Sequence, residues 1–392
     1  MSSALELARA IEPELIAIRR DLHQNPEVAW QESRTSAKVA DYCERLGLAV
    51  QRNVARTGVI ATLNAGKPGV VMAFRADMDA LPIQEENEVP FKAACPGKGH
   101  LCGHDAHTAM LLGAARILAQ VKERIPFQVR FIFQPAEEVT EGGAELMLEE
   151  NRLAGIDEIF GLHVHPRLPT GSLGLRNGPL MASMDKFEIT IEGCGGHGAM
   201  PHLTRDPVLA AAETITALQA IVARRVDPFD SAVVSVCQMN AGSAFNVIPS
   251  QAQLVGTARS LTPLVRENLP RWIEEIASGV TAAHGQKARV RYVHGTPVLV
   301  NHPECMERMG RAFRALGGSL QEAAPTMGGE DFAWFLEKLP GCFGFLGAGD
   351  GTSATAQCFH SPRFNIDERA LAWGTALFVQ LVCDKAGTDL GF

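Results

Sequence analysis

Short apolar strands alternate with helical segments through the first half of the chain, and this alternation limits the fold more than any other sequence feature. Strands are expected near 48–54, 58–64, 70–75, 128–135 and 158–166, and helices at 3–22, 105–120 and 141–150. Alternating strands and helices, with several strands apolar throughout, are typical of an α/β sheet covered on both faces. We therefore expect an α/β domain in this part of the chain.

The pattern changes at about residue 184. Strands at 185–193, 231–242, 251–261 and 287–293 and helices at 206–225 and 262–284 give the order β-α-β-β-α-β. This order is that of a ferredoxin-like α+β unit. Helices at 303–316, 330–338 and 366–385 then follow around a strand at 342–349. The sequence predicts an α/β domain formed by 1–183 and 295–392, interrupted by an inserted domain at 184–294.

Length and composition narrow the class of protein. A chain of 392 residues is long enough for two domains, and its net charge of -8 without a Lys/Arg-rich stripe argues against nucleic-acid binding. The sequence has no run of about 18 apolar residues, so no membrane span is expected. The amphipathic N-terminus does not resemble a secretory signal, and the nine cysteines follow no paired spacing. These features predict a cytoplasmic protein.

Metal-ligand residue types gather in four segments that follow predicted strands or lie near a helix start. The segments are HLCGHDAH (100–107), QPAEEVTEGG (134–143), GLHVHP (161–166) and CFHSPRF (358–364). Ligand sites of open α/β sheets lie at the carboxyl ends of the strands. Thiolate, imidazole and carboxylate together suit a borderline divalent cation such as Zn, Mn, Co or Ni. The sequence thus predicts a metal site.

The acidic pair after the strand at 128–135 indicates hydrolysis. Glu138 is placed to bind metal, while Glu137 faces the water between metal and substrate. A divalent metal makes water nucleophilic near neutral pH, and a nearby carboxylate can move its proton to the leaving amine. Asp77, after the strand at 70–75, is a candidate to orient a ligand histidine.

A cysteine nucleophile is the main chemical alternative. Cys102 and His104 are close enough in sequence to form a thiol and its base. That scheme leaves the acidic pair, His163 and His360 without a role, whereas a metal site uses all of them.

A second polar group falls in the inserted domain. Glycines flank His197 in GCGGHGAMPH, so the backbone can approach another group closely, and His197 could stabilise a developing oxyanion. Asn246 and Arg259 could hold a substrate carboxylate, the arginine through two hydrogen bonds.

Ordered blocks along nearly the whole chain resemble the M20 metallopeptidase family. They are FRADMDALPI, GHLCGHDAHTAMLLGAA, FQPAEE, GLHVHPRLPTG, GGHGAMPH, NVIPSQAQLVGTARS, MGGEDFAWF and FHSPRFNIDE. The resemblance is strongest to the amidohydrolase branch, which includes hippurate hydrolases, bacterial aminoacylases and plant auxin-conjugate hydrolases. It implies a metallopeptidase-like α/β catalytic domain with an inserted ferredoxin-like α+β domain that serves as a lid or dimerisation domain.

The resemblance also implies site residues. The family's two divalent metal ions per subunit would be bound by Cys102, His104, Glu138, His163 and His360. Glu137 corresponds to the general base and Asp77 to the supporting aspartate. His163 is preferred to His165 because it is the first histidine of GLHVHP, and His100 and His107 are left as structural or supporting residues.

For the inserted domain, the resemblance gives three further assignments. His197 corresponds to a histidine that in dimeric relatives reaches into the partner's active site, and Asn246 and Arg259 match positions that contact the substrate carboxylate. Gly99, Leu101 and Gly198 depart from the usual residues. None of these departures removes a ligand or the base.

The expected function is cleavage of an N-acyl amino acid, of the hippurate or N-acetyl type, into a carboxylate and a free amino acid. The expected assembly is a homodimer or higher homo-oligomer. A dipeptidase or carboxypeptidase of the same superfamily is one alternative, and a non-catalytic binding protein on the same fold is another.

Overall fold

The computed structural model describes residues 3–353 and 355–387, and the chain divides into two units. The first is formed by Met1–Gly178, Val300–Ala324 and Trp334–Phe392, and the second by Pro179–Leu299 and Pro325–Ala333. The last of these segments was expected in the catalytic domain. It joins the second unit because Ala182 donates its backbone N–H to the Thr326 and Gly328 carbonyls, and Thr326 donates to Leu180.

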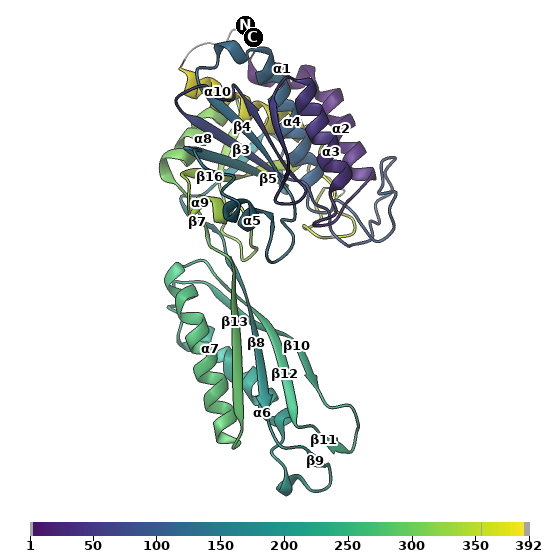
Figure 1. The fold of residues 1–392 in the computed structure, drawn as a ribbon, viewed down its shortest axis with the longest axis vertical. Coiled ribbons are helices and arrows are strands. Elements are labelled where there is room, and N and C mark those ends of the chain that lie inside the picture. The colour runs from purple at the N-terminus through teal and green to yellow at the C-terminus, as the bar shows by residue number, and fades with distance from the viewer. Residues whose placement is uncertain (1–2, 354, 388–392) are drawn as a thin grey trace. The chain divides into compact units, whose positions relative to one another are not determined.

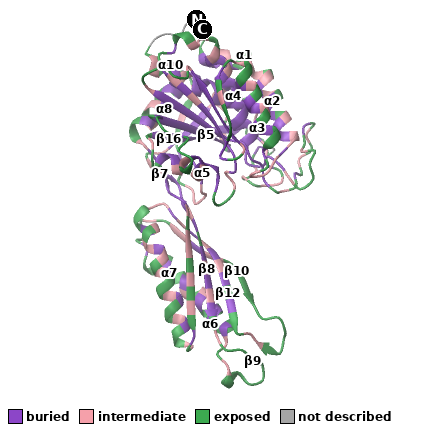
Figure 2. Ribbon diagram, in the orientation of Figure 1, coloured by how far each residue is buried: buried purple, intermediate pink, exposed green. Residues whose placement is uncertain are grey.

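An eight-stranded mixed sheet forms the centre of the first unit, in the order β1-β2-β4-β3-β5-β16-β6-β15 (Figure 1). Its strands are β1 (Ala49–Val54), β2 (Gly58–Leu63), β3 (Val71–Asp77), β4 (Gln128–Gln134), β5 (Glu158–Pro169), β6 (Ser172–Leu175), β15 (Ser319–Glu322) and β16 (Gly341–Gly349). β3 runs parallel to β4 and β5, and β5 runs parallel to β16. Strands β2, β3 and β16 are buried at every residue, as Figure 2 shows, so both faces of the central sheet are covered.

Helices pack along this sheet. They are α1 (Ala4–Ala10), α2 (Glu12–Gln24), α3 (Ser33–Arg45), α4 (His104–Gln120), α5 (Gly143–Glu149), α8 (Pro303–Ala315), α9 (Ala333–Leu336) and α10 (Ala370–Ala386), with a short 3-10 turn, η1 (Lys122–Arg124). Helix α4 packs on β3 and β5 and is flanked by α2 and α10, whereas α3 packs on β1 and β2 and α8 on β16, β6 and β15. The start of α4 is thereby fixed beside the central parallel strands.

Two N-terminal helices differ from expectation. The segment 3–22 was expected as one helix, but it breaks at Ile11. The new helix, α2, begins at Glu12 and has Pro13 in its first turn, where the missing backbone N–H is tolerated. Helix α3 was not predicted at all. Its buried face consists of Thr35, Ser36, Val39, Ala40 and Cys43. These positions recur at helical spacing, so the sequence carried a helical signal here that the prediction did not include.

The second unit has the ferredoxin-like order that the sequence predicted. Its main elements are β8 (Ser183–Glu192), α6 (Pro207–Arg224), β10 (Ala232–Ala241), β12 (Gln251–Ser260), α7 (Pro263–Ala283) and β13 (Lys287–Thr296). The antiparallel sheet runs β10-β12-β8-β13, and both helices pack against it over a core that includes Phe187, Leu218 and Leu269.

Short elements complete the chain: β7 (Gly178–Met181), β9 (Gly196–His197), η2 (Pro201–Leu203), β11 (Val247–Ile248) and β14 (Leu299–Asn301). Strands β9 and β11 pair with each other, as do β7 and β14. Within residues 3–353 and 355–387, no helix combines the length and apolar character needed to cross a lipid bilayer.

Candidate metal centre

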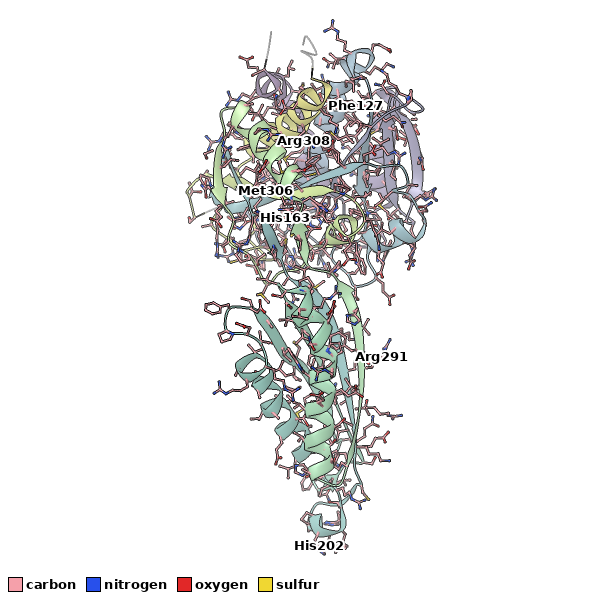
Figure 3. All side chains as sticks on the ribbon, turned by 90° about the vertical axis from the view of Figure 1, so that its left-hand side faces the viewer. Phe127, His163, His202, Arg291, Met306 and Arg308 are labelled. Carbon is pink, nitrogen blue, oxygen red and sulfur yellow. The ribbon has the colours of Figure 1, made fainter. Side chains whose placement is uncertain are left out.

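The ligand-type side chains of the first unit lie at the carboxyl ends of neighbouring parallel strands. Asp77 is the last residue of β3, Glu137 and Glu138 follow β4 after Pro135 and Ala136, and His163 lies within β5. Cys102 and His104 come from the start of α4, which packs on β3 and β5, and His360 from the segment between β16 and α10. His163 is labelled in Figure 3, at this end of the sheet. The fold thus brings residues from five separate segments together.

Gly103 allows the start of α4 to carry two of these side chains. It lies at a φ of 97°, and a Cβ atom at this position would lie 2.4 Å from Val164 Cγ2. Only glycine fits both the left-handed backbone and the close approach. Cys102 and His104, on either side of it, are both directed toward β5 and the loop after β4, where Cys102 meets His163 and His104 meets Glu138.

The donor atoms lie close enough together to hold a metal ion. Cys102 Sγ lies 3.3 Å from His163 Nε2, and Glu138 Oε1 lies 3.1 Å from His360 Nε2 and 3.8 Å from His104 Nε2. Four sets of donors in this unit have their ligand atoms within 4.8 Å of one another: Cys102–His104–His163, Asp77–His104–His107, Cys102–Glu138–His360 and His104–Glu137–Glu138. All five expected ligands are included in these sets.

The hydrogen bonds of the histidines show which ring nitrogens can accept a cation. His163 Nδ1 donates to the Val164 carbonyl at 2.8 Å, which leaves the Nε2 lone pair directed toward Cys102. His104 Nε2 is buried and has no hydrogen-bond partner among the described residues. A buried nitrogen without a partner, surrounded by thiol, imidazole and carboxylate groups, fits a bound divalent cation.

His107 is excluded as a ligand because both of its ring nitrogens are used. Its Nε2 accepts the backbone N–H of Val164 at 2.9 Å, so the proton is on Nδ1, which donates to Asp77 at 2.6 Å. The expected supporting role of His107 agrees with these bonds. His100 is also buried, and both of its ring nitrogens lack a hydrogen-bond partner among the described residues.

Two aspartates support the site, and the sequence pattern indicated only the first. Asp77 accepts hydrogen bonds from Arg75 at 2.7 Å and from His107, and lies 3.7 Å from His104 Nε2. Asp79 lies 3.3 Å from His104 Nδ1, the nitrogen on the far side of the ring. Asp79 therefore orients His104, as a carboxylate typically orients a ligand imidazole. The repeated aspartate in RADMD was the sequence signal that was available for it.

The acidic pair is held through its backbone. The carboxylate of Asp79 accepts the N–H groups of Glu137 and Glu138, each at 3.1 Å. With its backbone fixed, the Glu137 side chain lies 4.0 Å from His104 Nε2, beside the donor cluster. His360 is in the left-handed region at φ 63° and is held by a hydrogen bond from its N–H to the Leu101 carbonyl.

The charges around the cluster favour a cation. Although burial alone would lower it, the carboxylates of Asp77, Asp79 and Glu138 raise the pKa of His104 to about 10. Burial and the nearby Glu138 and Glu137 raise the pKa of Cys102 well above its usual value. An activated cysteine nucleophile needs the opposite, a lowered pKa. Without a cation, Cys102 is therefore not activated as a nucleophile, whereas a bound cation would stabilise its thiolate.

The candidate residues of the second unit lie at two separate places within it. His197 and Asn246 lie close together because β9 pairs with β11 and Gly198 donates its N–H to the Asn246 carbonyl at 2.8 Å. Both are exposed. The β9–β11 pair lies next to the start of β12, because β11 ends at Ile248 and β12 begins at Gln251. Arg259 is near the end of β12, where it pairs with Met184 and donates to the Met327 carbonyl at 2.9 Å.

The distance between Asn246 and Arg259 excludes one arrangement within a single chain. The strand rise separates the two ends of β12 by about 26 Å or more. Asn246 and Arg259 of one chain therefore do not hold one carboxylate group together.

The chain resembles known hydrolases over nearly its full length. It is 40% identical over 374 residues to the N-acetylcysteine deacetylase of Bacillus subtilis, covering 95% of this chain and 97% of that protein. It is 38% identical over 369 residues to thermostable carboxypeptidase 2 of Saccharolobus solfataricus, covering 93% and 94%.

The chain is also similar to a solved structure. Bacillus subtilis YXEP, a dinuclear metal-binding peptidase of the M20 family, superposes with a TM-score of 0.85 at 38% identity, covering 97% of this chain and 99% of that one. The profile of peptidase family M20/M25/M40 matches residues 73–384. The chain belongs to peptidase family M20/M25/M40.

Proposed function

We propose that this protein is a metal-dependent amidohydrolase that cleaves the amide bond of N-acyl amino acids, of the N-acetyl or hippurate type. One observation carries the proposal: the unpartnered His104 Nε2 is buried among sulfur, imidazole and carboxylate donors, with Glu137 4.0 Å away. A cation site with a carboxylate beside it is an arrangement that can hydrolyse an amide.

The proposed cofactor is a pair of divalent ions, of Mn, Zn, Co or Ni, held by Cys102, His104, Glu138, His163 and His360. Mixed sulfur, nitrogen and oxygen donors suit these borderline cations. Such ions polarise an amide carbonyl and make water nucleophilic near neutral pH. Asp79 and Asp77 keep the ligands and the acidic pair in place through the hydrogen bonds described above.

The chain's own residues then move the protons and hold the substrate. Glu137 takes a proton from the attacking water and passes it to the amine that leaves. His197 stabilises the negative charge that develops on the carbonyl oxygen. Asn246 and Arg259 bind the substrate carboxylate, the arginine with its planar guanidinium.

The proposed assembly is a homodimer formed through the inserted domain. Because Asn246 and His197 lie at the opposite end of β12 from Arg259, one site would receive these residues from two different chains. The outer strand β10 is exposed from Gln238 to Ala241 and offers an edge that a second chain could pair with.

The proposed compartment is the cytoplasm. All nine cysteines lie within the described residues, and all are free thiols. Free thiols are typical of a reducing compartment.

Amine release tests the function directly. The protein is incubated with manganese and a panel of N-acetyl, N-benzoyl and longer N-acyl amino acids, together with free dipeptides. Release from one acyl class supports the proposal. Release from no member of the panel, with bound metal confirmed by elemental analysis, contradicts it.

The same panel separates a second candidate, a carboxypeptidase or dipeptidase. The 38% identity to thermostable carboxypeptidase 2 favours this possibility. Faster turnover of free dipeptides or of blocked peptides than of simple N-acyl amino acids would support it.

A further inference from the structure

Glu32 is a fully buried carboxylate that lies outside the metal centre. It directly precedes α3, and its exposed fraction is 0%. Buried carboxylates are rare unless they are hydrogen-bonded, so its partners indicate what it does. Residues 1–72, which contain Glu32, lie outside the part of the chain that the family profile matches.

The partners of Glu32 connect three segments. Its Oε1 accepts the backbone N–H of Ala136 at 2.8 Å and of Trp30 at 3.1 Å, and its Oε2 accepts the hydroxyl of Thr57 at 2.7 Å. Two of these partners belong to the surrounding N-terminal structure. The third, Ala136, is the residue immediately before the acidic pair.

Ala136 is in a conformation that needs support. Its φ is 51°, in the left-handed region that alanine rarely adopts, and such a residue persists only where its surroundings hold it. Pro135 precedes it, and Gly143 donates its N–H to the Ala136 carbonyl at 3.0 Å. The backbone of Ala136 is thus fixed on one side by Gly143 and on the other by Glu32.

Two carboxylates therefore bind three consecutive amides. Glu32 accepts the N–H of Ala136, and Asp79 accepts those of Glu137 and Glu138. Asp79 also contacts His104, so it serves the cluster directly, whereas the hydrogen bonds of Glu32 go to Ala136, Trp30 and Thr57 and to none of the five expected ligands. The effect of Glu32 on the site passes through the backbone of Ala136.

We propose that Glu32 is a positioning residue for the general base Glu137, acting by holding Ala136 in its left-handed conformation. The proposal rests on the amidohydrolase function proposed above. Glu32 touches neither the substrate nor the metal ligands. Its loss displaces the Glu137 carboxylate from its place beside the donor cluster while the cluster itself remains formed.

Glu27 offers a matched control. It lies in the same N-terminal segment, and its carboxylate accepts the backbone N–H groups of Arg34 at 3.0 Å and Thr35 at 2.8 Å. These amides belong to the first turn of α3, far along the chain from the acidic pair. Glu27→Ala therefore removes comparable hydrogen bonds without releasing Ala136.

The kinetic test compares Glu32→Ala, Glu32→Gln and Glu27→Ala. We expect Glu32→Ala to lower kcat about 10- to 100-fold with KM and bound metal nearly unchanged, because a displacement of about 1 Å is sufficient for such a loss. Glu32→Gln keeps a carbonyl oxygen that accepts the hydrogen bond from the Ala136 N–H, so it should retain most of the activity that Glu32→Ala loses. Equal kcat losses in Glu32→Ala and Glu27→Ala would overturn the proposal.

Amide hydrogen exchange tests the same idea without any substrate. In Glu32→Ala, the amides of residues 136–138 should exchange about tenfold faster or more, because one of their hydrogen bonds is lost. In Glu27→Ala, the faster exchange should be confined to the start of α3. Unchanged exchange at 136–138 in Glu32→Ala would overturn the proposal, whatever the substrate of the enzyme is.

A second variant covers the case in which Glu32→Ala does not fold. Glu32→Asp keeps the charge but shortens the side chain by one methylene, so its carboxylate no longer reaches the Ala136 amide. It should show the same pattern of lower kcat and faster exchange. Wild-type kcat together with wild-type exchange in this variant would also overturn the proposal.

Discussion

The two units of this protein present their candidate functional residues in opposite ways. In the first unit, the ligand-type side chains come from five segments, are mostly buried, and have their donor atoms within a few ångströms of one another. In the second unit, His197 and Asn246 are exposed and Arg259 lies at the other end of β12. One group is gathered at one place in its unit, and the other is spread along the length of β12.

The two groups of residues are therefore expected to have different roles. The buried cluster is rigid because its ligands are fixed by further bonds, as Asp79 fixes His104 and the Val164 carbonyl fixes His163. In the proposed dimer, the exposed His197 and Asn246 act on a site that a second chain completes. We expect substitutions in the first unit to change proton transfer or metal binding. Substitutions in the second unit should change kcat or KM without loss of metal.

The largest effect is expected for Glu137→Gln. Removing a general base typically costs about 10²- to 10⁴-fold, and we expect turnover to fall about 10³-fold or more. Metal content should stay at the wild-type level because Glu138 and the other ligands are unchanged. Amine release and elemental analysis on the same sample measure both quantities. Wild-type turnover would show that the base has been misassigned.

His197→Ala should lower kcat about 10²-fold without loss of metal, as expected for the removal of one group that stabilises an oxyanion. If this histidine acts across a dimer, co-expression of His197→Ala with Glu137→Gln should restore activity, because a mixed dimer contains one intact site. Activity is measured on the purified mixed dimer. No recovery would mean that the residue acts within its own chain.

Metal affinity should rise with pH, by up to about 100-fold between pH 7 and pH 8. Carboxylates hold the pKa of His104 at about 10 against the effect of burial, and the pKa of Cys102 is raised by burial and by Glu138, so both groups carry a proton in this range when metal is absent. Both protons must leave when a cation binds. His163 loses none, because burial lowers its pKa.

Competition titration against a chelator at the two pH values measures this slope. His197→Ala is the control and should give the same slope, because it lies in the other unit. An affinity that does not depend on pH would contradict the protonated state of His104 and Cys102 in the metal-free protein.

The smallest effect is expected for Arg259→Lys. Lysine keeps the charge but loses the planar pair of donors, so KM should rise about tenfold with kcat nearly unchanged. Steady-state kinetics measure both constants. The matched control is a substrate amide that lacks the free carboxylate, for which the variant and the wild type should differ little. A fall in kcat with constant KM would place Arg259 in the chemistry instead.

Much of the fold was predictable from local pattern. The apolar strands at 71–77, 128–134 and 158–169 and the ferredoxin-like order of the second unit follow from periodicity that a few neighbouring residues display. Helix α3 was not predicted, although its buried positions Thr35, Val39 and Cys43 recur at helical spacing. The segment 325–333 was placed in the wrong unit because only long-range backbone hydrogen bonds connect it to β7 and the residue after it.

By itself, the sequence determined the residue types of the site and the strand ends that carry them, because these depend on order along the chain. Only the tertiary structure decided which groups are partners: Asp77 with His107, Asp79 with His104, and Glu32 with Ala136. These pairs are separated by 25 to 104 residues. Hydrogen bonds depend on distances of about 3 Å, and packing of the whole chain sets such distances, whereas local propensity does not.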